Sequence, residues 1–184
     1  MPSKSATRGD YRGSGYDRGH LVPAGDMAFN EEAMSETFYM SNMSPQKRNF
    51  NGGIWRELEE TTRDWAKKYK HLYVVTGPVL TQRKLDKVGY NEVTVPSSYF
   101  KVLLDVTEPE MKGIGFIIEN EVSNKPLANY AVTIDEVESL TGINFFSDLL
   151  SPKKEELLEA TTEVGRWKFS EKRYKQRIKS WNTR

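Results

Sequence analysis

The chain has 184 residues, which is enough to bury a sizeable core, and one domain over residues 1–184 is expected. Its 27 Lys and Arg nearly balance its 26 Asp and Glu, so a nucleic-acid partner would have to be recognised by local charge patterns. The sequence contains no cysteine, which excludes disulfides, thiolate zinc sites and cysteine nucleophiles. No apolar run approaches the roughly 20 residues that span a bilayer, so no membrane partner is expected.

The N-terminal part of the chain is predicted to be mostly irregular. Residues 1–15 are polar and rich in glycine and serine, unlike a secretory signal, and are expected to form a flexible lead-in. Prolines and glycines interrupt the next segment, Pro45 among them, and a short helix is predicted over Asn30–Glu36. The stretch TFYMSNM, residues 37–43, has the β-branched and aromatic character of a short strand, which is predicted over Tyr39–Asn42.

The clearest helix signal covers Gly53–Lys70. Large and aromatic side chains recur there at spacings of three and four, while charged residues fill the other positions. The stripe consists of Trp55, Leu58, Thr62, Trp65 and Tyr69. This face of the helix is therefore predicted to pack against the core.

The following residues predict a sheet and a second helix. Strands are predicted over residues 71–80, 90–106 and 113–121. The first should be buried and end at Gly77–Pro78. The second helix should begin with Thr133 or Asp135 as its N-cap and end near Gly142. Helices and strands in this order favour an α+β fold with a mainly antiparallel sheet.

The C-terminal extension, residues 151–184, differs in composition from the rest. It contains ten Lys and Arg against five Glu, with aromatic residues between them. Such a segment could bind nucleic acid by stacking and charge. Packing on the domain, with the charges in solvent, is the favoured interpretation.

Candidate chemistry begins with the stretch GYDRGHLVPAGDM, residues 15–27, which contains one of the two histidines. Imidazole titrates near neutral pH, so His20 could take a proton from water. Arg18 offers a planar fork of donors to a phosphate. A structural histidine in a turn is the alternative. The other histidine, His71, has no charged partner nearby in sequence and is interpreted as structural.

A second cluster lies just before and within the helix predicted over Gly53–Lys70. Asn51 precedes the helix, and Glu59 and Arg63 lie four residues apart on it. Amide and carboxylate oxygens are hard ligands of the kind that Mg²⁺ takes. The alternative is an N-cap asparagine with an ordinary i,i+4 ion pair.

Together, the DRGH stretch and the pattern N-x-G-x-W-x-x-L-E-x-x-x-R about 30 residues later resemble the DNA/RNA non-specific endonucleases of the ββα-metal class. The resemblance covers roughly Tyr11 to Leu150 and continues through FYMSNMSPQ, LYVVTGPVL, VPSSYFKVLLD and VTIDEVESLTGINFF. It implies a ββα-metal unit made from the Asp17–His20 strand, the Tyr39–Asn42 strand and the Gly53–Lys70 helix. Members usually carry a further stretch before this region, whereas 16 residues precede Asp17 here.

The resemblance implies a role for each site residue. His20 would be the general base that activates water, and Asn51 would be the direct Mg²⁺ ligand. Glu59 would contact the metal through water, and Arg63 and Arg18 would bind the substrate phosphate and stabilise its charge. Supporting positions would be Asp17, Asn42 and Gln46.

The implied activity is Mg²⁺-dependent cleavage of DNA and RNA without sequence specificity, giving 5′-phosphate ends, with Mn²⁺ as a substitute metal. A homodimer and an inhibitor protein stay open as partners, and a secreted or periplasmic bacterial location is expected, although residues 1–15 contain no signal. Two alternatives stay open: a non-catalytic nucleic-acid-binding relative, and a toxin-type nuclease module.

Overall fold

The computed structural model describes residues 5–183 and has an α+β fold. The strands of its largest sheet are β3 (Leu72–Pro78), β6 (Ser98–Asp105), β7 (Lys112–Glu119) and β8 (Ala131–Val132). They are antiparallel in the order β3-β6-β7-β8. The predicted mainly antiparallel sheet is therefore confirmed.

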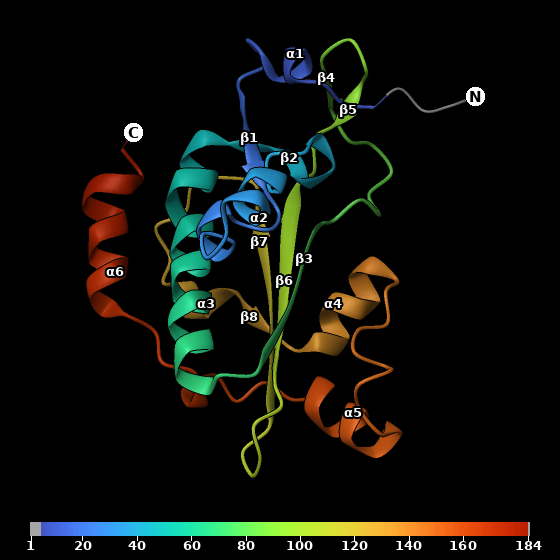
Figure 1. Cartoon of the computed structure of the whole chain (residues 1–184), viewed down its shortest axis with the longest axis vertical. Coiled ribbons are helices and arrows are strands. Elements are labelled where there is room, and N and C mark those ends of the chain that lie inside the picture. The colour runs from blue at the N-terminus through green and yellow to red at the C-terminus, as the bar shows by residue number, and fades with distance from the viewer. Residues whose placement is uncertain (1–4, 184) are drawn as a thin grey trace.

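Helices cover both faces of this sheet (Figure 1). The main ones are α3 (Arg56–Tyr69), α4 (Ile134–Thr141), α5 (Pro152–Glu159) and α6 (Glu171–Gln176). Helix α3 lies on one face, with α6 outside it, whereas α4 and α5 lie on the other face. Helix α4 has the predicted N-cap, since the Thr133 side chain accepts from the Glu136 N–H, and Gly142 ends it in the left-handed conformation.

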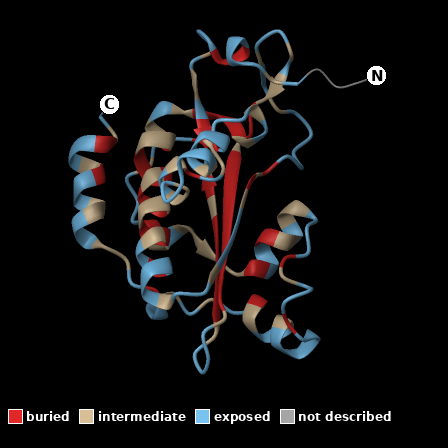
Figure 2. Ribbon diagram, viewed as in Figure 1, coloured by how far each residue is buried: buried red, intermediate tan, exposed pale blue. Residues whose placement is uncertain are grey.

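Strand β6 forms the centre of the core because helices cover both of its sides, and it is buried along its whole length (Figure 2). Its alternate side chains point to opposite faces. Tyr99 and Leu103 pack with α3, whereas Phe100 and Val102 pack with α4.

Strand β3 differs from the prediction for residues 71–80. Within residues 5–183 it pairs only with β6, so it is an edge strand, and Tyr73, Val74 and Val75 are exposed. An apolar run does not tell a central strand from an edge strand, and the predicted burial was wrong for this reason.

A separate two-stranded sheet carries the candidate site. Strand β1 (Tyr16–His20) is antiparallel to β2 (Met43–Lys47). The strand predicted over Tyr39–Asn42 is wrong, because Met40–Asn42 form a 3-10 turn and the strand follows it. Between the two strands lies the predicted short helix, observed as α2 (Glu31–Glu36) with Asn30 as its N-cap.

The helix predicted from Gly53 begins later, because a π-helical segment, Phe50–Trp55, precedes α3. Gly53 has a non-helical backbone (φ −105°, ψ −110°) that kinks this segment. A Cβ atom at Gly53 would lie 2.7 Å from Asn182 Oδ1, so the Asn182 side chain would have to shift to accept any other residue there. The predicted stripe is otherwise correct, since Trp55, Leu58, Thr62 and Trp65 are buried.

The expected loose lead-in does not fit the residues just before β1. Helix α1 (Arg8–Tyr11) forms there, and Asp10 and Tyr11 are buried. Asp10 accepts hydrogen bonds from Asn91, which lies between β4 (Lys87–Val88) and β5 (Val93–Thr94). These bonds hold the pKa of Asp10 well below its usual range. Residues 1–4 of that prediction lie outside the described residues.

The C-terminal extension packs on the domain, as favoured from its sequence. Trp167 is buried in the core beside Trp65, with ring centroids 4.8 Å apart. Arg177 is fully buried and forms an ion pair with Glu57 of α3. It also donates to the Lys125 carbonyl at 2.6 Å. The extension therefore contributes to the core on the α3 side of the sheet.

This buried ion pair gives a stability prediction. Arg177→Met should lower the free energy of unfolding by about 3–5 kcal/mol, because Glu57 is left as a buried charge without a partner. At roughly 2–4 °C for each kcal/mol, thermal unfolding should report this clearly. Because Glu57→Gln removes the stranded charge, the double variant should recover part of the loss. Lys175→Met, in an exposed pair, should leave the midpoint unchanged; an equal fall there would contradict the argument.

Candidate active site

The candidate site lies where β1 ends beside the turn that precedes α3. His20 is the last residue of β1 and lies opposite Met43 in the ladder. The pairing continues past it, because the Leu21 N–H donates to the Asn42 carbonyl at 3.0 Å. The ladder therefore fixes the backbone on both sides of the histidine.

Gly19 allows the two strands to approach closely. It lies opposite Ser44, and a Cβ atom at Gly19 would lie 2.1 Å from the Gln46 side chain. Gln46 is fully buried and therefore fills the space above the glycine. This explains why a residue without a side chain separates Arg18 from His20.

Asn42 fixes the turn between α2 and β2. Its side chain accepts from the Val22 N–H at 2.9 Å and donates to the Val22 carbonyl at 2.9 Å. It also donates to the Thr37 carbonyl at 2.8 Å. Asn42 thus links both ends of the segment that follows His20.

Asn51 lies in the π-helical segment and is oriented by β1. Its Nδ2 atom donates to Asp17 Oδ2 at 3.2 Å, and Asp17 Oδ1 accepts from Arg48 at 3.4 Å. A carboxylate only accepts hydrogen bonds, so the amide nitrogen of Asn51 must face Asp17. Within residues 5–183 no hydrogen bond to Asn51 Oδ1 is found, which leaves this oxygen for another ligand.

A cavity of about 510 Å³ lies beside β1, and both His20 and Asn51 line it. Three arginines contribute to its wall: Arg8, Arg12 and Arg18. This concentration of positive charge suits an anionic chain such as a phosphate backbone.

A second cavity of about 420 Å³ lies against the start of α3, and His20 and Asn51 line it as well. Its wall includes Glu59 and Arg63. The two cavities therefore meet at His20 and Asn51, which brings together the two sequence clusters predicted to form one site.

The charged groups that interact with Glu59 include Lys101, Arg63 and Asp26. Arg63 donates to Asp26 Oδ1 at 2.7 Å, which fixes the guanidinium over this cavity. Lys101 of β6 is almost fully buried and donates to Thr76 Oγ1 at 2.5 Å. Burial raises the pKa of Glu59 and lowers that of Lys101, while their mutual attraction opposes both shifts.

His20 is half-buried, and its ring lies edge-on to Phe38 with centroids 4.8 Å apart. Its Nε2 atom is buried and has no hydrogen-bond partner within residues 5–183. Burial lowers the pKa of His20, and the positive charge of Arg18 adds to this effect. The imidazole is therefore neutral at neutral pH and can accept a proton.

Three charged residues at the site were not predicted. Arg8 and Arg12 belong to the stretch expected to be a loose lead-in, and the repeated arginines in RGDYRGSGYDRGH were the available signal. Lys101 is the one charged residue inside the apolar run SYFKVLL, which marks it as unusual for a buried strand.

Strands β1 and β2 followed by α3, with His20 and Asn51 at shared cavities, form the ββα arrangement expected of a metal-dependent nuclease. The family model of the DNA/RNA non-specific endonucleases matches residues 1–151. The chain therefore belongs to this family.

Similar proteins agree with this assignment. Mitochondrial endonuclease G of Bos taurus is 35% identical over 158 residues, covering 79% of this chain and 53% of that protein. Mitochondrial nuclease 1 of Schizosaccharomyces pombe is 37% identical over 169 residues, covering 83% and 52%. The chain thus spans about half the length of these relatives. The crystal structure of an EndoG/EndoGI complex, which concerns EndoG inhibition, has a TM-score of 0.75 and 33% identity, covering 87% of this chain and 68% of that one.

The comparisons correct one expectation. A secreted or periplasmic bacterial location was predicted, but the two relatives described above are mitochondrial nucleases of eukaryotes. That prediction is wrong. No helix in residues 5–183 is long and apolar enough to cross a membrane.

The environment of His20 gives a titration prediction. Its pKa should lie below 6.5, because burial and Arg18 both disfavour the protonated ring. Arg18→Gln should raise this pKa, since it removes a nearby positive charge. NMR titration can follow the two histidines separately, with His71→Gln to assign the signals. A His20 pKa above 6.5 would show that the neighbouring carboxylates outweigh both effects.

Proposed function

We propose that the protein is a Mg²⁺-dependent endonuclease that hydrolyses phosphodiester bonds of DNA and RNA without sequence specificity and leaves 5′-phosphate ends. The observation that carries this proposal is the position of His20 and Asn51, which line the same two cavities. One cavity has arginines in its wall, and the other has Glu59 and Arg63. A candidate base, a candidate cation site and anion-binding arginines therefore lie around the place where the two cavities meet.

His20 is the proposed general base. Its lowered pKa keeps the imidazole neutral, so it can take the proton of the attacking water. The β1–β2 ladder holds its backbone, and Phe38 restricts its ring. These contacts orient the base before the substrate binds, which lowers the entropic cost of reaction.

Asn51 and Glu59 are the proposed cation site. The Asn51 oxygen is the direct ligand, because Asp17 engages the amide nitrogen. Glu59 acts through solvent from the other side of the cavity. Mg²⁺ suits so few protein ligands, since it retains several waters, and Mn²⁺ is the proposed substitute. When bound, the cation supplies Lewis-acid stabilisation of charge on the phosphate and the leaving oxygen.

Arg63 and Arg18 are the proposed phosphate-binding groups at the reacting centre. Asp26 holds the Arg63 guanidinium in place, which reduces the entropy lost when the phosphate binds. Arg18 is exposed on β1 beside His20, so it can reach a phosphate without crossing the core.

Broad substrate choice follows from the same groups. Arginines that bind phosphate carry no base information, so both DNA and RNA should be cleaved. The names of the relatives favour a mitochondrial nuclease, and the EndoG/EndoGI complex favours an inhibitor protein as a partner. Homodimer formation stays a prediction.

Substitutions at the site should separate the base from the metal ligand. His20→Ala should still bind DNA and Mg²⁺ but cleave about 10²–10⁴-fold more slowly, because only the base is lost. Asn51→Ala should lose activity through weaker metal binding, and high Mg²⁺ should restore part of it. Glu59→Ala should have a smaller effect on metal affinity. Single-turnover plasmid cleavage and calorimetry with Mg²⁺ measure these effects.

The matched control is His71→Ala, which should cleave at the unaltered rate. If His20→Ala loses Mg²⁺ as completely as Asn51→Ala, then His20 is a metal ligand and the mechanism is wrong. If the unaltered protein binds DNA but cuts it neither with Mg²⁺ nor after EDTA, the protein is a non-catalytic relative.

The arginines of α1 and the following turn give a binding prediction. Arg12→Gln and Arg8→Gln should each weaken DNA binding and reduce the slope of log K against log salt by about 1, if each contacts one phosphate. The cleavage rate at saturating DNA should change little. Lys153→Gln removes the same charge from α5 and should leave the slope unaltered. Equal slopes for all four proteins would show that this cavity does not hold the substrate backbone.

A further inference from the structure

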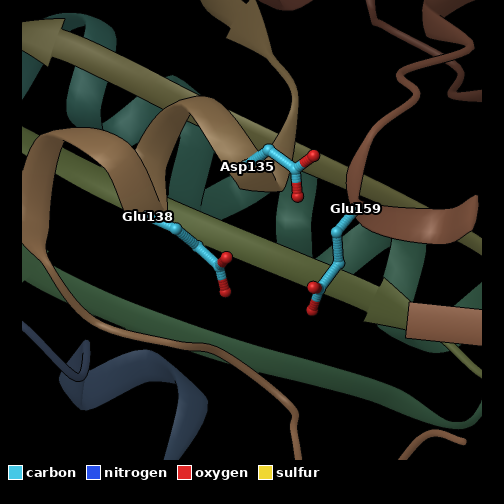
Figure 3. Close-up of side chains that lie close together, drawn as sticks. All are labelled: Asp135, Glu138 and Glu159. Carbon is cyan, nitrogen blue, oxygen red and sulfur yellow. The ribbon is translucent and has the colours of Figure 1, made fainter. Parts of the chain in front are cut away.

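Three carboxylates gather far from the nuclease site, on the sheet face opposite α3. Asp135 and Glu138 come from α4, and Glu159 is the last residue of α5. One oxygen from each lies within 4.8 Å of the others. Figure 3 shows the three side chains turned toward a common space between the two helices.

Glu159 is the unusual member of this cluster. It is 3% exposed, and its Oε1 atom is buried without a hydrogen-bond partner in residues 5–183. A buried carboxylate normally has donors or a counter-charge, because burial of an unpaired charge is strongly unfavourable. The carboxylate instead points toward two other acids.

Positive charge is missing from the surroundings of the cluster. None of the ion pairs within residues 5–183 includes Asp135, Glu138 or Glu159, and Lys154 of α5 pairs with Glu108 instead. Burial raises the pKa of Glu159 to about 7, and the charges of Glu138 and Asp135 contribute to the rise. One oxygen of Glu138 has a neutral partner, since the Phe145 N–H donates to Glu138 Oε1 at 2.6 Å. Within the described residues, no basic side chain therefore balances the charge of this cluster.

We propose that Asp135, Glu138 and Glu159 bind a calcium ion between α4 and α5. Ca²⁺ takes about 6–8 oxygen ligands at about 2.3–2.6 Å in a flexible geometry, which suits several carboxylates and waters around one ion. Mg²⁺ requires near-ideal octahedral geometry at about 2.0–2.1 Å and is usually held by only one or two carboxylates, so three converging carboxylates favour calcium. Exposed Asp135 leaves one side of the site open to solvent for entry of the ion and for water ligands.

The ion would join two parts of the chain. Asp135 and Glu138 lie within the residues that match the family model, whereas Glu159 lies beyond residue 151. The helices already contact each other and strand β7. Calcium would add a bridge that fixes the start of the C-terminal extension, and it would act on stability and not on the cleavage step.

Thermal unfolding with and without calcium tests the site. After chelator treatment, addition of Ca²⁺ at about 100 times its dissociation constant should raise the Tm by roughly 5–10 °C. Glu159→Gln should lose most of this rise. It should also be at least as stable as the unaltered protein in chelator, because the substitution removes a charge repelled by two others. Calorimetry should show one calcium site fewer in this variant.

Two control variants test whether the rise in Tm depends on this particular cluster. Glu156→Gln removes an exposed carboxylate from the same helix and should keep the full rise. Asn51→Ala should also keep it, which separates this site from the nuclease site. If Glu159→Gln does not fold, exposed Asp135→Asn replaces it, with the same loss expected.

Three outcomes would overturn the proposal. A Tm that Ca²⁺ does not raise, combined with a rise on mild acidification, would indicate carboxyl groups that share a proton. An equal rise with Mg²⁺ at the same concentration would refute the choice of calcium. An undiminished rise in Glu159→Gln and Asp135→Asn would place the bound ion elsewhere.

Discussion

The buried side chain of Tyr99 connects the sheet to the candidate active site. Its hydroxyl donates to the Pro45 carbonyl at 2.8 Å and pairs with the Ser44 hydroxyl at 2.7 Å, which holds strand β2. Its ring stacks on Phe50 with centroids 5.3 Å apart and lies against Trp55 at 5.6 Å. Burial raises the pKa of Tyr99, so the hydroxyl stays protonated and remains a donor.

These contacts explain how strands β1 and β2 meet the π-helical segment Phe50–Trp55. Strand β2 pairs with β1 and so places His20, while Phe50 and Trp55 bracket the segment that contains Asn51. A single side chain from strand β6 therefore fixes the proposed base relative to the proposed metal ligand. Since precise placement is what a preorganised site requires, the core and the catalytic geometry depend on the same packing.

The sequence grouped the candidate site residues more successfully than it predicted the backbone that carries them. Residue types raised His20 and Asn51 as candidates beside structural alternatives, the family resemblance implied their roles, and the structure places both at the same two cavities. The strand position was missed, since Pro45 suggested a break. In a two-stranded ladder, however, a residue without an N–H is tolerated where that position faces away from the partner strand. The contribution of Lys101 was also missed, because only the fold brings β6 beside Glu59.

Glu59 and Glu159 show how neighbouring charges can lead two glutamates to different chemistry. Burial raises the pKa of both carboxyl groups. The charges of Lys101 and Arg63 oppose this rise at Glu59, whose pKa is nevertheless raised to about 7. The neighbours of Glu159 are acids, so its ionised form requires a positive charge from outside the chain. Burial raises both pKa values, and the surrounding charges therefore decide which partner each glutamate needs in its ionised form.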